Sequence, residues 1–169
     1  WQANEWAIYH RVYSDPTLTR WQLYERMSAR RTQRKFAFHR ASIQEARVYG
    51  WSFAIVLNGQ ADSQLPAGTV VGHLDLWVSN VSGRKLSCGY GVFEEARNQG
   101  YASEALKAIC DEVLKNWAID GIDATAFGEN EASARVLLRT GFTLKSGVIT
   151  TVRKRMKLRR MFHYGRTRD

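Results

Sequence analysis

The spacing of apolar and polar positions changes along the first half of the chain. Residues 4–13 carry apolar side chains at helical intervals up to the turn-forming letters SDPT, and a longer, mostly polar helix is expected from about 23 to 48. Runs rich in β-branched and aromatic residues follow at 51–57, 68–78 and 85–93, with turn-forming segments between them. The pattern therefore predicts two helices and then an antiparallel meander of three strands.

The second half of the chain begins with a helical period. Within 103–118 the apolar residues recur at three- and four-residue intervals, which is typical of a helix that packs one face on a sheet. A strand is expected at 121–127, followed by a helix that Asn130 caps and Gly141 ends. The segment 142–158 reads as two more strands. With neither a repeat nor a linker, this order of elements predicts an α+β fold built on one central sheet.

Composition limits the class of protein. The 169 residues, 44% of them hydrophobic, are enough for one core, and we expect a single domain over 1–169. The sequence shows neither an apolar run long enough to span a membrane nor a leader peptide. Cys88 and Cys110 are too few for a disulfide framework and are not spaced as metal ligands, and Cys110 is expected to be an inert core residue. We therefore expect a cytoplasmic protein without a metal.

Positive charge is concentrated in two segments. Residues 152–169 contain eight Lys or Arg and one Asp, and so contribute +7 of the net charge of +9. A second cluster lies at Arg30, Arg31, Arg34 and Lys35. Such clusters attract anionic partners such as RNA, an acidic protein or the phosphates of a cofactor, although a solvated basic face explains each of them equally well.

The letters RNQGYA, residues 97–102, stand between the third expected strand and the helix that follows it. The first turn of a helix carries unpaired N–H groups and a partial positive charge, so it attracts anions. Gly100 lets the backbone approach a ligand, Ala102 keeps the next position small, and Arg97 offers a charged contact to a phosphate. An ordinary helix cap has similar residues, so the loop alone leaves both interpretations open.

Two motifs together resemble the GCN5-related N-acetyltransferases, the GNAT family. RNQGYA matches the R/Q-x-x-G-x-G/A motif that binds the pyrophosphate of acetyl-CoA, and NEASARVLLRTGF, residues 130–142, resembles the second motif, N-x-x-S/A followed by G-F. One helix and one strand separate Gly100 from Asn130, as in the family. The letters YSDPTLTRW, together with Ser133, point to the branch that acetylates ribosomal-protein N-termini, the Rim-type enzymes.

The resemblance implies a fold and a cofactor site. The fold would be a single central, mixed and mostly antiparallel sheet that is splayed and flanked by helices, with acetyl-CoA in the splay. Backbone groups of Tyr90 and Val92 would pair with pantetheine, main-chain amides would hold the pyrophosphate, and Arg135 or Arg139 would reach the 3′-phosphate. The implied cofactor-binding residues are Tyr90, Val92, Arg97, Asn98, Gln99, Gly100, Tyr101, Ala102, Ser103, Asn130, Ser133 and Arg139.

The family reaction is direct attack of a neutral amine on the thioester. It needs a base for the ammonium, a donor that polarises the carbonyl, and a proton for the departing thiolate. The carbonyl would be polarised by a backbone N–H near Val92. Many relatives carry a Tyr seven residues after the motif Asn to protonate the thiolate, but this chain has Leu137 there. Ser133 is the remaining candidate to hydrogen-bond the sulfur.

Asp75 and Glu94 are the candidate bases. His73 and Asp75 share one face of an expected strand with Trp77, and such a His–Asp pair is more often a structural hydrogen bond. Glu94, next to Glu95, is more often a residue of the surface rim. An α-amine, with a pKa of about 7.7–8.0, is partly neutral at pH 7, whereas a lysine amine at about 10.4 needs a strong base. The absence of an evident strong base therefore favours a protein N-terminal α-amine as the acceptor.

Other partners and functions stay open at this point. The same chemistry on an aminoacyl-tRNA, a polyamine or an amino-sugar antibiotic is an alternative, although a protein of charge +9 should repel polyamines. A non-catalytic module that binds acyl-CoA or nucleic acid is a third interpretation. The basic clusters suggest RNA or ribosome contact, and no membrane partner is expected. Relatives usually begin with a strand that this sequence does not show, so both a monomer and a homodimer are possible.

Overall fold

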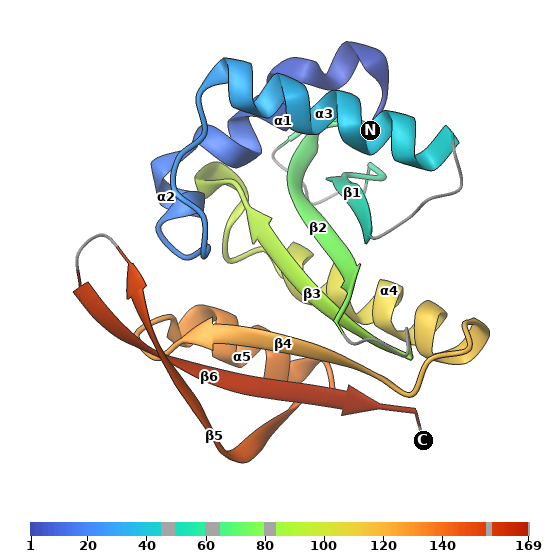
Figure 1. Ribbon diagram of the computed structural model, residues 1–169. Coiled ribbons are helices and arrows are strands. Elements are labelled where there is room, and N and C mark those ends of the chain that lie inside the picture. The colour runs from blue at the N-terminus through green and yellow to red at the C-terminus, as the bar shows by residue number, and fades with distance from the viewer. Residues whose placement is uncertain (45–49, 60–64, 80–83, 155–156, 169) are drawn as a thin grey trace. The chain divides into compact units, whose positions relative to one another are not determined.

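The computed structural model describes residues 1–44, 50–59, 65–79, 84–154 and 157–168. Its helices are α1 (Trp6–Ser14), α2 (Pro16–Thr19), α3 (Ala29–Gln44), α4 (Tyr101–Asn116) and α5 (Glu131–Arg139), with short 3-10 turns η1 (Ala3–Glu5) and η2 (Glu94–Ala96) (Figure 1). The strands are β1 (Gly50–Val56), β2 (Val70–Val78), β3 (Lys85–Val92), β4 (Gly121–Phe127), β5 (Thr143–Lys154) and β6 (Lys157–Thr167).

The described strands form one six-stranded sheet in the order β1-β2-β3-β4-β6-β5. β3 and β4 pair in parallel, from Lys85 opposite Gly121 to Cys88 opposite Ala124. β4 with β6 and β5 with β6 are antiparallel. The sheet is therefore mixed and mostly antiparallel, and the α+β fold predicted from the sequence is confirmed.

The chain divides into two compact units. Unit 1 comprises Trp1–Asp75 and Tyr90–Tyr101, and unit 2 comprises Leu76–Gly89 and Ala102–Asp169. In unit 1, α1 packs on α3, and their shared core is aromatic. Its buried members are Tyr9, Val12, Tyr13, Leu18, Phe36 and Phe93.

Unit 2 contains α4 from Ala102 onward, α5, and the strands β4, β5 and β6. α5 contacts β4 and β5, and β5 forms a long hairpin with β6 (Figure 1). Leu106 and Cys110 of α4, Ile122 of β4 and Leu137 of α5 are all fully buried. Burial raises the pKa of the Cys110 thiol to about 12, so this thiol is inert at neutral pH, as expected for a core residue.

Three sequence predictions need correction. The helix expected at 23–48 begins at Ala29, because residues 20–28 form a connection that the Met27 N–H fixes to the Tyr13 carbonyl at 2.8 Å. Its described part ends at Gln44, and residues 45–49 lie outside the described ranges. The SDPT letters end α1 but also begin α2, since the Asp15 side chain caps its first turn. Of the two strands placed within 142–158, β6 begins only at Lys157 and runs to Thr167.

Gly72 on β2 lies so close to the backbone of β3 that no side chain fits there. A Cβ at this position would be 2.2 Å from the carbonyl oxygen of Gly91. We expect Gly72→Ala to lower the free energy of unfolding by about 3 kcal/mol, because the clash is with strand backbone and cannot be relieved by a rotamer change. Urea denaturation measures this loss.

Gly89→Ala is the matched control for this change. A Cβ at Gly89 would lie 3.4 Å from the ring of Trp77, an ordinary packing distance to a side chain. We expect Gly89→Ala to change the free energy of unfolding by less than about 1 kcal/mol. Equal losses in the two variants would contradict the close strand approach at Gly72.

Candidate active site

The segment from Arg97 to Gly100 forms an exposed loop that leads directly into α4. Asn98 has a φ of 62° and Gly100 a φ of 85°, both in the left-handed region. No atom of the described chain lies within 4 Å of a Cβ built on Gly100, so the backbone there faces open space. The 16-residue helix α4 begins at the next residue, with its unpaired N–H groups in the first turn. Left-handed residues between right-handed ones are typical of loops whose successive N–H groups bind an anion.

The side chain of Arg97 is turned back into unit 1. Its Nε donates to the Val92 carbonyl at 3.1 Å, and its Nη2 donates to the Thr17 hydroxyl at 2.8 Å. The sequence suggested a direct contact between this side chain and a phosphate. In the structure two of its three nitrogens bind protein atoms instead.

The end of β3 carries the backbone groups predicted to pair with pantetheine. The Tyr90 carbonyl accepts from the Gln22 side chain at 3.4 Å, and the Val92 carbonyl accepts from Arg97. The Phe93 N–H donates to the Val71 carbonyl at 2.9 Å, which holds the end of β3 to β2. The carbonyls of both residues whose backbone groups the sequence assigned to pantetheine therefore accept hydrogen bonds from side chains.

Asp75 on β2 lies beside the aromatic side chain of Tyr13 within unit 1. One carboxylate oxygen accepts from the Tyr13 hydroxyl at 3.5 Å, and the other is buried without a hydrogen-bond partner among the described residues. His73 is 1% exposed, and within the same part of the chain its Nδ1 also lacks a partner. The structural His–Asp hydrogen bond that the sequence suggested is therefore absent from the described residues.

Other polar groups surround this carboxylate. Burial, with Asp75 contributing, raises the pKa values of Tyr9, Tyr13 and Tyr24, so their hydroxyls keep their protons. Burial lowers the pKa of His73, and the negative charge of Asp75 only partly opposes this shift, so the imidazole stays neutral at pH 7. The tyrosine and histidine side chains around Asp75 are thus neutral at pH 7.

Lys35 and His39 of α3 extend the polar cluster. The Lys35 Nζ lies 3.2 Å from the His39 Nε2 and 5.1 Å from the centroid of the Tyr13 ring. Burial lowers the pKa of Lys35, while the charge of Asp75 acts against this. The Tyr9 hydroxyl lies 3.1 Å from the His39 Nδ1. The sequence treated Lys35 only as part of a basic cluster, because its contact with Tyr13 joins residues far apart in the chain.

The two glutamates of η2 have different surroundings. Glu95 forms a bidentate pair with Arg11, with N–O distances of 2.7 and 2.8 Å, and this pair lowers the pKa of Glu95. Glu94 is exposed to solvent. Glu129, the acid next to Asn130, lies 3.2 Å from Arg159. Among these acids, Glu95 and Glu129 are paired with arginines.

Unit 2 holds the residues of the second motif. The Asn130 side chain caps α5 by accepting from the Ser133 N–H at 3.3 Å. Leu137 is fully buried, so the position where relatives carry a Tyr belongs to the core here. Arg139 is exposed in the last turn of α5, and Arg135 is 3.4 Å from Glu131. Ala102 and Ser103 continue α4 in this unit.

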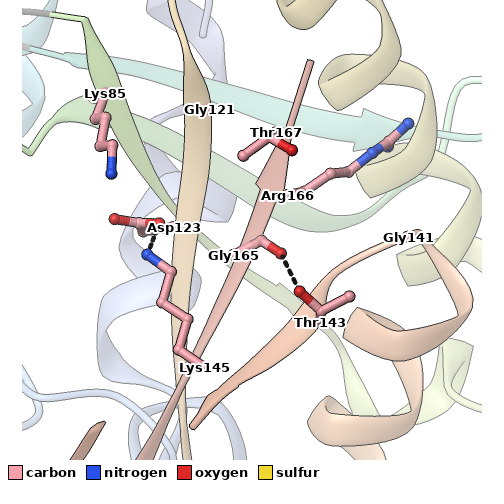
Figure 2. A pocket seen from close by; sticks show the side chains of 9 residues that line it. All are labelled: Lys85, Gly121, Asp123, Gly141, Thr143, Lys145, Gly165, Arg166 and Thr167. Carbon is pink, nitrogen blue, oxygen red and sulfur yellow. Dashed lines mark hydrogen bonds and ion pairs between the residues drawn. The ribbon is translucent and has the colours of Figure 1, made fainter. Parts of the chain in front are cut away.

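Unit 2 also contains a surface pocket of about 410 Å³. Two contacts join residues that line it (Figure 2). The Lys145 ammonium binds the Asp123 carboxylate, and the Thr143 hydroxyl donates to the Gly165 carbonyl at 3.2 Å. Lys85 and Arg166 also line it, so cationic side chains outnumber acidic ones. None of the predicted cofactor or catalytic residues lines this pocket.

The described residues contain neither a cluster of metal-binding side chains nor a membrane-spanning helix. No group of three or more His, Cys, Asp or Glu side chains is arranged to hold a metal ion there. In the same residues no helix combines the length and the apolar character needed to cross a bilayer.

Solved structures with the same fold come from several acetyltransferases. A GNAT-family acetyltransferase from Bacillus anthracis is 19% identical with a TM-score of 0.77, over 99% of this chain and 92% of that one. Spermidine N-acetyltransferase from Vibrio cholerae, solved with CoA and spermine, is 11% identical with a TM-score of 0.81. That match also covers 99% of this chain and 92% of the other. The Salmonella typhimurium enzyme that modifies the N-terminal serine of ribosomal protein L7/L12 is 17% identical with a TM-score of 0.74, again over 99% and 92%.

Comparison at the sequence level identifies the family. The uncharacterized N-acetyltransferase YoaA of Bacillus subtilis is 35% identical over 66 residues, which are 39% of this chain and 37% of that protein. The match thus spans little more than a third of the curated relative. The model of the acetyltransferase (GNAT) domain matches residues 1–143. This chain therefore belongs to the GNAT acetyltransferase family, whose cosubstrate is acetyl-CoA.

Proposed function

We propose that this protein transfers the acetyl group of acetyl-CoA to a primary amine, preferentially a protein N-terminal α-amine, as a single domain over 1–169. The observation that carries the proposal is the exposed loop with left-handed backbone at Asn98 and Gly100 directly before α4. The loop and the helix N-terminus together offer several N–H groups to a pyrophosphate. Family membership supports acetyl-CoA as the molecule that carries it.

The proposed roles of the cofactor residues are those that the two family motifs imply. Main-chain groups from Arg97 through Ser103 hold the pyrophosphate. Tyr90 and Val92 bind pantetheine through backbone groups. Their carbonyls also accept hydrogen bonds from the side chains of Gln22 and Arg97. Asn130 fixes the first turn of α5, where the hydroxyl of Ser133 hydrogen-bonds the sulfur. Arg139, which is exposed, binds the 3′-phosphate.

Asp75 is the proposed base. The reaction starts from R–NH₃⁺ and acetyl-CoA and ends with the amide, the free thiol and one released proton, so one proton has to leave the amine before attack. Asp75 has a carboxylate oxygen with no hydrogen-bond partner among the described residues, and the tyrosine and histidine side chains around it are neutral. Glu94 is the weaker candidate because it is exposed.

The choice of acceptor rests on amine basicity. A carboxylate is a weak base, so it suits an α-amine with a pKa of about 7.7–8.0 better than a lysine amine at about 10.4. The fold shared with the enzyme that modifies L7/L12 is consistent with this choice, as is the Rim-type motif. A polyamine is the second candidate, because another protein of this fold was solved with spermine. The proposed setting is cytoplasmic, near ribosomes, with the protein acting as a monomer or a homodimer.

Thiol release with a panel of amines tests this function. At pH 7 we expect a peptide with a free α-amine to react at least about tenfold faster than an Nα-blocked lysine peptide, because over a hundredfold more of its amine is neutral. The difference should shrink as the pH rises toward 10, where the lysine amine also loses its proton. Spermidine and an aminoglycoside serve as the other arms.

Two outcomes would contradict the proposal. Faster turnover of spermidine or of the lysine peptide at pH 7 would overturn the choice of an α-amine. No turnover with any amine, together with salt-sensitive RNA binding, would favour a non-catalytic module instead.

A further inference from the structure

Arg97 connects two segments that lie 80 positions apart in the sequence. On one side its Nε donates to the Val92 carbonyl at 3.1 Å, and on the other its Nη2 donates to the Thr17 hydroxyl at 2.8 Å. All three residues belong to unit 1. The guanidinium thus joins the last residue of β3 to α2, immediately before the loop at 98–100.

Thr17 is itself held in one orientation. Its hydroxyl donates to an Asp15 carboxylate oxygen at 2.8 Å, and its backbone N–H donates to the same oxygen at 2.7 Å. Because the Thr17 proton is used by Asp15, a lone pair of the hydroxyl remains to accept from Arg97. The bonds therefore form one ordered series from Arg97 through Thr17 to Asp15.

A second bridge holds the same part of the chain. The Arg11 guanidinium stacks on the ring of Phe93 at 4.0 Å, pairs with Glu95 and lies 3.8 Å from Asp15. The bonds to Glu95 raise the pKa of Arg11. Residues 92–97 are thus fixed to α1 and α2 at two points, and the backbone enters the loop at 98–100 from a held position.

We propose that Asp15, Thr17 and Arg97 form a latch that sets the affinity of the loop for the pyrophosphate of acetyl-CoA. This inference rests on the proposed function of the loop. Arg97 is a positioning residue here, and Thr17 acts without touching the cofactor. The left-handed backbone at Asn98 is unfavourable for a residue with a side chain, so an unsupported loop spends less time in the binding conformation. Support from the latch lowers the ordering cost on binding.

Thr17→Val tests the latch because it keeps the shape of the side chain and removes the hydroxyl. We expect about a tenfold weaker affinity for CoA in calorimetric titration, and a similar rise in the KM for acetyl-CoA with kcat retained. Arg97→Gln should lose a similar amount. The double variant should lose no more than Arg97→Gln alone, because both changes break the same bond.

Thr19→Val is the matched control. The Thr19 hydroxyl lies at the end of the same short helix and donates to the Asp15 carbonyl at 2.8 Å, so it makes no bond to Arg97. We expect the affinity of this variant for CoA to match that of the wild type. A thermal midpoint close to that of the wild type for Thr17→Val excludes general unfolding as the cause of its weaker binding.

The possible failures have different signatures. Wild-type affinity in Thr17→Val, with a loss in Arg97→Gln alone, would overturn the latch and make Arg97 a direct phosphate ligand. Fully additive losses would overturn it as well. A wild-type protein that does not bind CoA would overturn the proposed function, and the latch with it.

Discussion

Gly100→Glu is expected to reduce the affinity for acetyl-CoA by at least about a hundredfold while the protein stays folded. The glutamate would place a negative charge at the proposed pyrophosphate site. Its carboxylate would repel the negatively charged pyrophosphate, because like charges in contact repel strongly. Its side chain has room, because nothing in the described chain lies within 4 Å of the Cβ position. The substitution therefore acts on the ligand rather than on packing.

The backbone strain of this change needs its own control. Gly100 has a φ of 85°, so any side chain there costs about 1 kcal/mol in the folded state. Gly68 has a φ of 81° and is equally open around its Cβ position. Gly68→Glu thus imposes the same strain and charge at a position outside the loop at 97–100. The affinity of this variant for acetyl-CoA should stay within about twofold of the wild type. Equal losses in both variants would rule out the loop as the pyrophosphate site.

Asp75→Asn is expected to lower kcat by about a hundredfold and to leave the KM for acetyl-CoA nearly unchanged. The amide keeps the shape of the carboxylate but cannot take a proton from the ammonium, and general bases contribute rate factors of about this size. The Tyr13 hydroxyl can still donate to the amide oxygen, so the local packing should persist. Steady-state thiol release with a saturating α-amine peptide at pH 7 measures the effect.

Asp120→Asn supplies the comparison for a carboxylate outside the proposed site. Asp120 pairs with Arg84 on the surface of unit 2 and is about half exposed. We expect its kcat to stay close to that of the wild type. A kcat for Asp75→Asn within about threefold of the wild type would exclude Asp75 as the base and favour Glu94 as the base.

The strongly periodic parts of the fold could be predicted from the sequence. The strand 121–127 and the helix after Asn130 were predicted correctly, because their signals are local. Asn130 does cap α5, and Gly141 adopts the left-handed φ of 85° expected of a C-terminal glycine. Elements whose bounds depend on distant contacts were predicted less well. The start of α3 is the clearest case, since the Met27 N–H bonds to the Tyr13 carbonyl.

The candidate site shows the same division between local and distant information. The loop and its glycine could be recognised from consecutive letters, and the left-handed Asn98 was available as a signal, because Asn tolerates this conformation better than most residues. The partners of Arg97 and Asp75 could not be recognised. Thr17 and Tyr13 lie in the first two helices, and no local pattern connects them to Arg97 and Asp75, the residues they contact.

The β5–β6 hairpin changes what the charge of residues 152–169 means. Within the described side chains of this segment, Lys154 is 4% exposed, Arg166 pairs with Asp111, and Arg168 donates to the Trp117 carbonyl. Arg159 stacks on the ring of Phe127 at 3.9 Å. Cations held in this way displace few counterions from a nucleic acid. The affinity of this segment for RNA should therefore depend on salt far less steeply than eight unpaired cations would require, because much of its positive charge binds other parts of unit 2.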